Sequence, residues 1–292
     1  MNGTSSGPLA CFACEAMRTR FEIVLADDRD PAFLCAAAEQ ALAEIRQVEA
    51  DLSPYRPGSA IAAINSAPVG KTVQLDPLVF CLLSQAAELT TRLQGAFDLA
   101  VGAVTAAQRG FFGTRRITAG AKALHLDTSA MTVTRLTATL RLDPGAVGKG
   151  WALERALTIL RDVGLTNAFL HGGTSSVRAM GRGPTGRGWK VALPDSQDFV
   201  NLVDHALSIS SSVARRFASG AGMDFHIIDP RNGAPVTRAL TAAVLHEDGV
   251  VAEAISTALI VLGPAGVELV RRTFPSATVV HLAPAAHSVA NA

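Results

Sequence analysis

The 292-residue chain has few aromatic residues, few cysteines and almost no net charge. Aromatics make up 5% of it, cysteines number four, and the formal net charge is +1. Because acids and bases are interspersed, we expect no basic surface that would attract nucleic acid or an anionic membrane. No apolar run approaches the roughly 18 residues that a membrane-spanning helix needs. We therefore predict neither a nucleic-acid partner nor a transmembrane segment.

The N-terminus also lacks the basic start and apolar stretch of a signal peptide. As written, the chain is expected in the cytoplasm, with a leader removed earlier as the open alternative. Cys11 and Cys14 form a C-x-x-C pair, but no second ligand pair has the spacing of a zinc site. We interpret residues 1–14 as a flexible segment and residues 283–292 as a disordered tail.

Apolar residues make up 49% of the chain. Their spacing alternates along the chain between patterns typical of helices and patterns typical of strands. We predict one domain over residues 15–282, with two closely joined lobes as an alternative. Helices are predicted at 31–50, 77–93, 147–160, 251–262 and 264–272. Strands are predicted at 21–25, 168–171, 189–192, 205–210, 225–228, 240–245 and 277–282, with a hairpin over 133–143. Because strands after midchain follow one another without regular helical crossovers, the fold class is α+β, with mixed or antiparallel sheets flanked by helices.

The most informative segment is His226-Ile-Ile-Asp-Pro-Arg-Asn-Gly233. Proline fixes φ and glycine permits positive φ, so residues 229–233 are predicted to form a rigid corner. A histidine beside such a corner is suited to proton transfer or phosphate contact. A purely structural role for His226 is the alternative.

Two further loops carry polar or aromatic side chains between glycines and prolines. Tyr55, the only tyrosine, lies between two prolines, and Ser59 is a plausible N-cap for the helix that follows. A tyrosine held in such a loop can stack on a planar ring. Gly95 is expected at a helix C-terminus, after which Asp98 either caps the next element or accepts from a ligand.

A strand, a glycine-rich turn and a helix follow one another over residues 142–150. Backbone N–H groups at a helix start attract phosphate, and Lys149 adds a positive charge there. The spacing is not that of a Walker A loop. On the later helix Glu253 and Thr257 share one face, as oxygen ligands for Mg²⁺ would; solvent exposure and local bonding are the alternative.

In order, these segments resemble the FAD:protein FMN transferases, the ApbE family, from about Met17 to Leu262. The family patterns are M-G-T, S-x-Y-x-x-x-S before an N, G-x-F-D, D-x-G-G-x-x-K-G, G-G-D, S-G, H-I-I-D-P-x-T-G-x-P and A-D-A-x-x-T. The corresponding stretches here are 17–19, 53–65, 95–98, 143–150, 172–174, 212–213, 226–235 and 252–257. The resemblance implies an ApbE-like, T-fold-like architecture.

The resemblance also implies a chemistry: FAD binds with Mg²⁺, and its FMN half moves onto a threonine in a flavinylation motif of an acceptor protein, releasing AMP. By carry-over the candidate residues fall into three groups. The catalytic candidates are His226, as general base, and Asp143. The cofactor-binding candidates are Met17, Tyr55, Ala96, Phe97, Asp98, Asp143, Lys149 and Ile227. The metal candidates are Ala146, Glu253 and Thr257.

Four positions depart from the family patterns. Arg18 and Val213 stand where the family has glycine, Thr174 where it has aspartate, and Glu253 where it has the metal-binding aspartate. A transferase is therefore expected, with two alternatives on the same site: an FAD pyrophosphatase giving FMN and AMP, or a flavin-binding protein with impaired catalysis.

Overall fold

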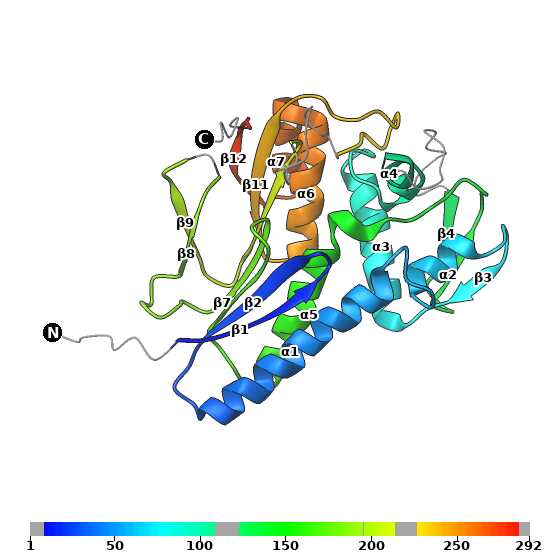
Figure 1. The fold of residues 1–292 in the computed structure, drawn as a ribbon. Coiled ribbons are helices and arrows are strands. Elements are labelled where there is room, and N and C mark those ends of the chain that lie inside the picture. Colours follow the sequence, from blue (N-terminus) through cyan, green and yellow to red (C-terminus); the bar gives the residue numbers. More distant parts are fainter. Residues whose placement is uncertain (1–8, 109–122, 195, 214–226, 286–292) are drawn as a thin grey trace, which may run out of the picture.

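A computed structural model describes residues 9–108, 123–194, 196–213 and 227–285 (Figure 1). Its centre is a seven-stranded sheet in the order β1-β2-β6-β7-β10-β11-β12, in which every neighbouring pair is antiparallel. The strands are β1 Leu9–Ala16, β2 Thr19–Ala26, β6 Ala168–Gly172, β7 Ser176–Met180, β10 Ala206–Ser211, β11 Leu240–His246 and β12 Thr278–Pro284. The α+β class with antiparallel strands is thus confirmed.

Helices cover one face of this sheet and a hairpin covers part of the other (Figure 1). The helices are α1 Pro31–Leu52, α5 Gly148–Asp162 and α6 Gly249–Leu262, and with the sheet they enclose the main hydrophobic core. The hairpin pairs β8 Trp189–Ala192 with β9 Phe199–Leu202. Its Trp189 ring stacks on Phe169 of β6 with centroids 5.4 Å apart, in a second, smaller apolar cluster.

Aspartate caps fix where three of the helices begin. Asp30, Asp76 and Asp248 accept hydrogen bonds from backbone N–H groups in the first turns of α1, α3 (Pro77–Arg92) and α6, respectively. In α1 and α3 a proline follows at the first position, where its missing N–H costs nothing. The predicted helix starts at residues 31 and 77 are confirmed for this reason.

A smaller group of elements lies beside the helical layer, at the right of Figure 1. It consists of α2 Ala60–Ser66, β3 Thr72–Gln74, α3 Pro77–Arg92, η1 Leu99–Val101, α4 Gly102–Gln108, β4 Leu124–Asp127 and β5 Thr132–Arg135, with the sheet order β3-β5-β4. The short η3 Pro144–Ala146 leads from it into α5, while η4 Gly263–Ala265 and α7 Gly266–Thr273 follow α6. The predicted N-cap Ser59 accepts from the Ala62 N–H at 2.9 Å.

Several boundaries differ from the predictions. Residues 9–14 are not a flexible segment but part of β1, because their backbone pairs with β2 along the sheet edge. Residues 133–143 do not form a hairpin: β5 ends at Arg135 and pairs back to β4 instead. Strands β3, β4, β7 and β9 were not predicted, and β12 extends to Pro284, inside the expected tail.

The stretch Gly249–Thr273 is long and apolar enough to cross a membrane by length and composition, with a window hydropathy of 1.8. Of that window, 72% is buried inside the protein, and α6 forms part of the main core.

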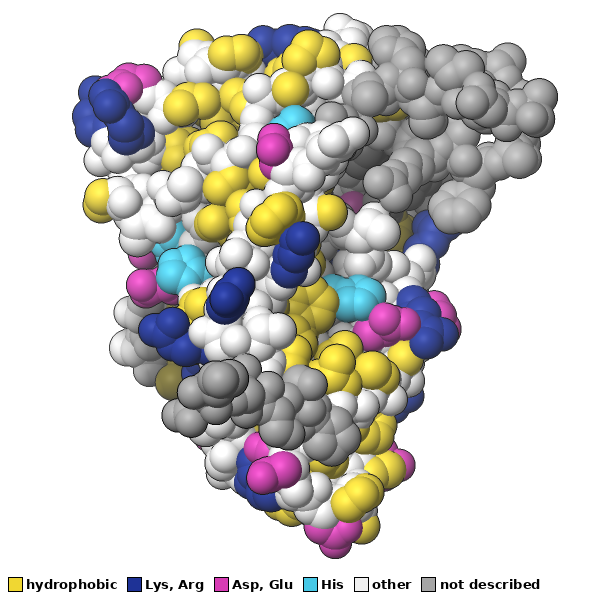
Figure 2. Space-filling model, turned by 90° about the vertical axis from the view of Figure 1, so that its left-hand side faces the viewer, with side chains coloured by type: hydrophobic (Ala, Val, Ile, Leu, Met, Phe, Trp, Pro, Cys, Tyr) yellow, Lys and Arg dark blue, Asp and Glu magenta, His cyan; other side chains and the backbone are white. Residues whose placement is uncertain are grey.

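On the face of the molecule in Figure 2, basic and acidic side chains are interspersed rather than gathered by sign.

Candidate active site

Several turns meet at one end of the seven-stranded sheet. Met17 and Arg18 join β1 to β2, and residues 173–175 join β6 to β7. Because Phe21 pairs with Gly172 and Ser176 with Ser208, both turns lie at the end where β10 finishes and β11 begins. The Gly173 N–H donates to the Arg20 carbonyl at 2.8 Å, which holds the two turns side by side. Four of the predicted site residues lie near this sheet end: Met17, Lys149, Glu253 and Thr257.

The Met17–Arg18 turn connects this sheet end to α1 and α5. Both residues have positive φ, +50° and +61°, as a two-residue hairpin turn of this hand requires. The Met17 N–H donates to Glu49 of α1 at 2.6 Å. An added Cβ on Gly148, the first residue of α5, would lie 3.8 Å from the Met17 sulfur. Met17 therefore borders the start of α5.

Asp143 shapes the turn that leads into α5. One carboxylate oxygen accepts from the Gly145 N–H at 3.0 Å and the other from the Thr105 hydroxyl at 2.9 Å. The Asp143 N–H in turn donates to the Leu99 carbonyl. Asp143 is 7% exposed, so its hydrogen bonds fix the backbone of η3 and present Ala146 and Lys149 just beyond it.

Lys149 and Glu253 bring the first turns of α5 and α6 together. The Lys149 ammonium lies 3.7 Å from Glu253 Oε1, with 25% of the lysine side chain exposed and 4% of the glutamate side chain. Glu253 Oε2 accepts from the Gly150 N–H at 2.8 Å, and Oε1 accepts from the Ser176 hydroxyl. The predicted phosphate-binding lysine and the predicted metal-binding carboxylate are thus neighbours.

One turn further along α6, Thr257 faces the end of β10. Its hydroxyl lies 3.4 Å from that of Ser210, which also contacts Ser256 at 2.7 Å. Within the described ranges, no three His, Cys, Asp or Glu side chains gather as a metal site. A cation here would need hydroxyl, carbonyl and ligand oxygens beside Glu253.

The segment Gly95–Asp98 lies next to the turn at Asp143, because the Asp143 N–H donates to the carbonyl of Leu99, the residue that follows this segment. Gly95 has φ +75°, as predicted for a helix C-terminus, and Asp98 caps η1 by accepting from the Ala100 N–H at 2.8 Å. Ala96 and Phe97 are 0% and 1% exposed, so these predicted lining side chains belong to the core here. Tyr55, by contrast, is 49% exposed in its loop.

The corner at residues 229–233 has the predicted rigid geometry. Asp229 accepts from the Arg231 backbone and side chain at 3.0 and 2.9 Å, and Gly233 has φ +75°. Burial alone would raise the pKa of Asp229, but the hydrogen bonds and charge of Arg231 outweigh it and lower this pKa. An added Cβ on Gly95 would lie 3.5 Å from Arg231 Cγ, so the corner packs beside Gly95–Asp98.

Of the remaining predicted residues, Ile227 packs against the main core, and its carbonyl accepts from the Val236 N–H at 2.8 Å. His226 lies outside the described residues, as does the first half of the strand predicted at 225–228. Ile228 makes an isolated bridge to Pro235.

The structure also shows how three departures from the family patterns are accommodated. Thr174 is exposed in the β6–β7 turn, where a side chain meets solvent. Val213 does not adopt positive φ, so the chain has no need of glycine there. Arg18 does adopt positive φ, a conformation that a residue with a Cβ takes at a cost.

Comparison with known proteins decides the family. The sequence model of the ApbE family matches residues 17–280. This chain belongs to the ApbE family. All eight motif segments lie inside the matched range.

Individual ApbE relatives agree with this assignment. The chain is 32% identical over 241 residues to an FAD:protein FMN transferase of Rhodobacter capsulatus, covering 76% of this chain but only 45% of that relative. It is 26% identical to the FAD:protein FMN transferase of Chlamydia trachomatis, covering 76% of each. The chain thus spans less than half of the first relative and about three quarters of the second.

Solved ApbE structures share the fold. The ApbE protein of Thermotoga maritima superposes with a TM-score of 0.80 at 23% identity, covering 95% of this chain and 97% of that one. The apo flavinyl transferase ApbE of Pseudomonas stutzeri gives 0.75 at 24% identity, covering 91% and 88%. At these identities the likeness establishes the architecture.

Three residues of this ApbE chain that lie beside the candidate site were not predicted from the sequence: Glu154, Ser176 and Arg178. Ser176 donates to Glu253, and Arg178 Nε lies 2.7 Å from Glu154 Oε1. Burial raises the pKa of Glu154, which the positive charge of Arg178 opposes. A repeated spacing, Gly150-x-x-x-Glu154 and Gly249-x-x-x-Glu253, could have drawn attention to Glu154, whereas no local signal marks Ser176 or Arg178.

Proposed function

We propose that this chain is an FAD:protein FMN transferase, which moves the FMN half of FAD onto a threonine hydroxyl of an acceptor protein and releases AMP. The observation that carries the proposal is the meeting of Lys149, the start of α5 and Glu253 at one end of the sheet. The positive end of a helix dipole, a lysine and a buried carboxylate lie together there. Attack on a pyrophosphate requires such groups, which bind the phosphates and neutralise their charge.

The start of α5 supports phosphate binding. Val147 precedes the helix without a side-chain cap, so the first N–H groups are open to another acceptor, except that of Gly150, which Glu253 takes. The helix dipole favours an anion at this end, and Lys149 adds a full positive charge. Lys149 is therefore assigned to the FAD phosphates, and Met17 to the wall beside them.

The oxygens around Glu253 support a bound Mg²⁺. An ionised carboxylate has about four lone-pair sites, and here the Gly150 N–H and the Ser176 hydroxyl take two. The remaining sites, with the Thr257 hydroxyl and the Ala146 carbonyl, are the hard oxygen ligands that Mg²⁺ prefers. The metal candidates Ala146, Glu253 and Thr257 therefore fit this ion.

When bound, Mg²⁺ would neutralise charge on the pyrophosphate oxygens during transfer. The acceptor threonine Oγ attacks the phosphorus on the FMN side, the bridging P–O bond breaks, and AMP leaves with the bridging oxygen. The threonine proton must pass to a base, the role assigned to His226. Lys149 moves from Glu253 towards the phosphates, so that the pair seen in the protein alone opens when substrate binds.

Product analysis tests the proposal. The chain would be incubated with FAD and Mg²⁺, with and without a protein domain bearing an acceptor threonine, and followed by mass spectrometry. A mass gain of FMN on the acceptor with AMP release supports transfer. FMN and AMP in equal amounts without acceptor would establish the pyrophosphatase instead, and intact FAD bound to the protein would establish a flavin-binding protein.

Removing the assigned groups sharpens this test. EDTA and Glu253→Gln should each abolish turnover, whereas Glu268→Gln should leave it unchanged because Glu268 is an exposed residue of α7 paired with Arg271. Lys149→Ala should raise the KM for FAD. Undiminished turnover in Glu253→Gln would refute the metal assignment.

A further inference from the structure

The first turns of α5 and α6 hold each other through two carboxylates. Glu253 of α6 accepts from the Gly150 N–H of α5 at 2.8 Å. In return, Glu154 of α5 accepts from the Gly249 N–H of α6, also at 2.8 Å. In each helix the glycine precedes the glutamate by four residues. The side chain of each glutamate extends to the other helix and accepts a hydrogen bond from the glycine N–H in its first turn. We call these four residues the reciprocal clasp.

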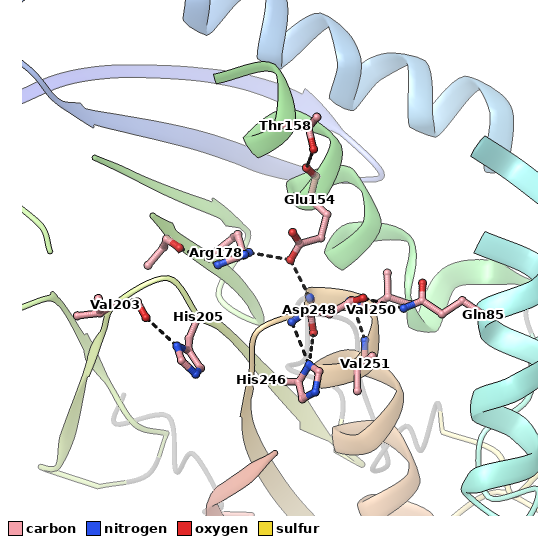
Figure 3. A network of polar contacts seen from close by, with 12 residues as sticks. Gln85, Glu154, Thr158, Arg178, Val203, His205, His246, Asp248, Val250 and Val251 are labelled. Carbon is pink, nitrogen blue, oxygen red and sulfur yellow. Dashed lines mark hydrogen bonds and ion pairs between the residues drawn. The ribbon is translucent and has the colours of Figure 1, made fainter. Parts of the chain in front are cut away.

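Strand β7 supplies the second partner of each carboxylate. Ser176 donates to Glu253. Arg178 donates to Glu154 with its Nε at 2.7 Å (Figure 3). The two residues are two apart in the strand, so both point to the same face of the sheet. Each half of the clasp thus has the same parts: a carboxylate, a backbone N–H of the other helix and a side chain of β7.

The helices cross here without room for adjustment. An added Cβ on Gly150 would lie 2.6 Å from the Gly249 carbonyl oxygen, and one on Gly249 would lie 3.2 Å from Glu154 Oε1. The space at this crossing, which Gly150, Gly249 and Glu253 line together with residues of β7 and β10, has no room for a water molecule. A shift of either helix at this crossing is therefore expected to displace the other helix.

We propose that Glu154 is a positioning residue, which through the Gly249 N–H and Arg178 sets the start of α6 and thereby where Glu253 and Lys149 stand. This inference rests on the proposed function, because it says which residue keeps the proposed phosphate-binding Lys149 and the proposed metal-binding Glu253 in their positions relative to each other. Glu154 itself touches neither FAD nor metal. It acts through the backbone of α6.

The control is an ion pair of the same helix that lies outside the clasp. Arg155 of α5 binds Glu44 of α1 at 2.9 Å, and both side chains are about one fifth exposed, 20% and 21%. Glu44→Ala therefore removes a comparable ion pair from α5, one residue away from Glu154, without touching the clasp. It measures what general loosening of α5 does.

The experiment compares Glu154→Ala, Glu154→Gln and Glu44→Ala in the full chain. Amide hydrogen exchange is followed in peptides covering 147–153 and 247–254, together with the dissociation constant for FAD and the steady-state constants. Glu154→Ala should speed exchange in both peptides and raise the dissociation constant and KM for FAD about tenfold, a typical loss for a residue that orients a ligand. Glu154→Gln keeps an acceptor for the Gly249 N–H, so it should recover most of the protection.

General destabilisation has a different signature. It lowers the active fraction and hence the apparent kcat, leaving KM unchanged, and this is what Glu44→Ala should show. Equal KM changes in Glu154→Ala and Glu44→Ala, or protection retained at 147–153 in Glu154→Ala, would overturn the positioning role. If the wild-type chain binds FAD without turning it over while the peptides respond as expected, the proposed function fails and the clasp stands.

Discussion

Replacing Gly150 by alanine tests the close crossing of α5 and α6 most directly. The added Cβ would meet backbone, at 2.6 Å from the Gly249 oxygen and 2.8 Å from its carbonyl carbon, and would lie 2.9 Å from Glu253 Oε2. Contacts this short with backbone cannot be relieved by turning a side chain. One helix must shift, which also lengthens the bond between the Gly150 N–H and Glu253.

The magnitude follows from two opposing effects. Alanine is better than glycine inside a helix by about 1 kcal/mol. Forcing a methyl group into a packed interior costs about 1–3 kcal/mol, and weakening a buried hydrogen bond to a charged group costs about 1–3 kcal/mol more. The net expectation for Gly150→Ala is a loss of about 1–5 kcal/mol in the free energy of unfolding.

Gly148→Ala is the matched control, two residues earlier in the same helix. Its Cβ would meet only the Met17 sulfur, at an ordinary 3.8 Å, and neither glycine has positive φ. Urea unfolding followed by circular dichroism should therefore show Gly148→Ala at or slightly above wild-type stability and Gly150→Ala well below it. Equal stabilities of the two variants would refute the close crossing of the helices.

Three further outcomes are expected. Arg18→Gly should stabilise the chain by about 0.5–1 kcal/mol in thermal unfolding, because glycine takes the φ of +61° without the penalty of a Cβ. Asp248→Ala should destabilise it by about 1–2 kcal/mol in denaturant unfolding, because its carboxylate caps Val250 and Val251 at 2.7 and 3.2 Å. Burial lowers the pKa of His246 below its ordinary 6.5, so the unfolded chain binds this proton more readily and stability should fall as pH drops below about 6.5. His246→Asn should flatten that part of a stability–pH curve, and an unchanged slope would contradict the assignment.

Local signals made much of the fold predictable. The Asp-Pro pairs at residues 30–31 and 76–77 fixed two helix starts, because cap and proline act within a single turn. β7 was missed because all five of its residues, Ser176–Met180, are buried, on both faces of the sheet, so no alternation marks it. β1 was missed because its status as a strand comes from pairing along the sheet edge, which local composition does not reveal.

The site was predictable where a motif fixes a turn and unpredictable where the partner comes from far along the chain. The corner at 229–233 follows from Pro230 and Gly233 alone. That Phe97 lies in the core, 1% exposed, depends on how two groups of elements pack. The roles of Glu154 and Glu253 depend on the crossing of helices about a hundred residues apart in sequence, and spacing within one helix cannot report it.

The structure of this chain explains why position 253 carries glutamate rather than the shorter aspartate of the family. Glu253 uses its length to reach both the Gly150 N–H of α5 and the Ser176 hydroxyl of β7, so its carboxylate is held by two separate elements. Aspartate, one methylene shorter, could not keep both contacts without moving α6 closer, and the glycine crossing leaves no space for that. Restoring the family residue by Glu253→Asp should therefore weaken this chain's site rather than improve it, whereas a gain in turnover would show that Ser176 and Gly150 play no part in placing the carboxylate.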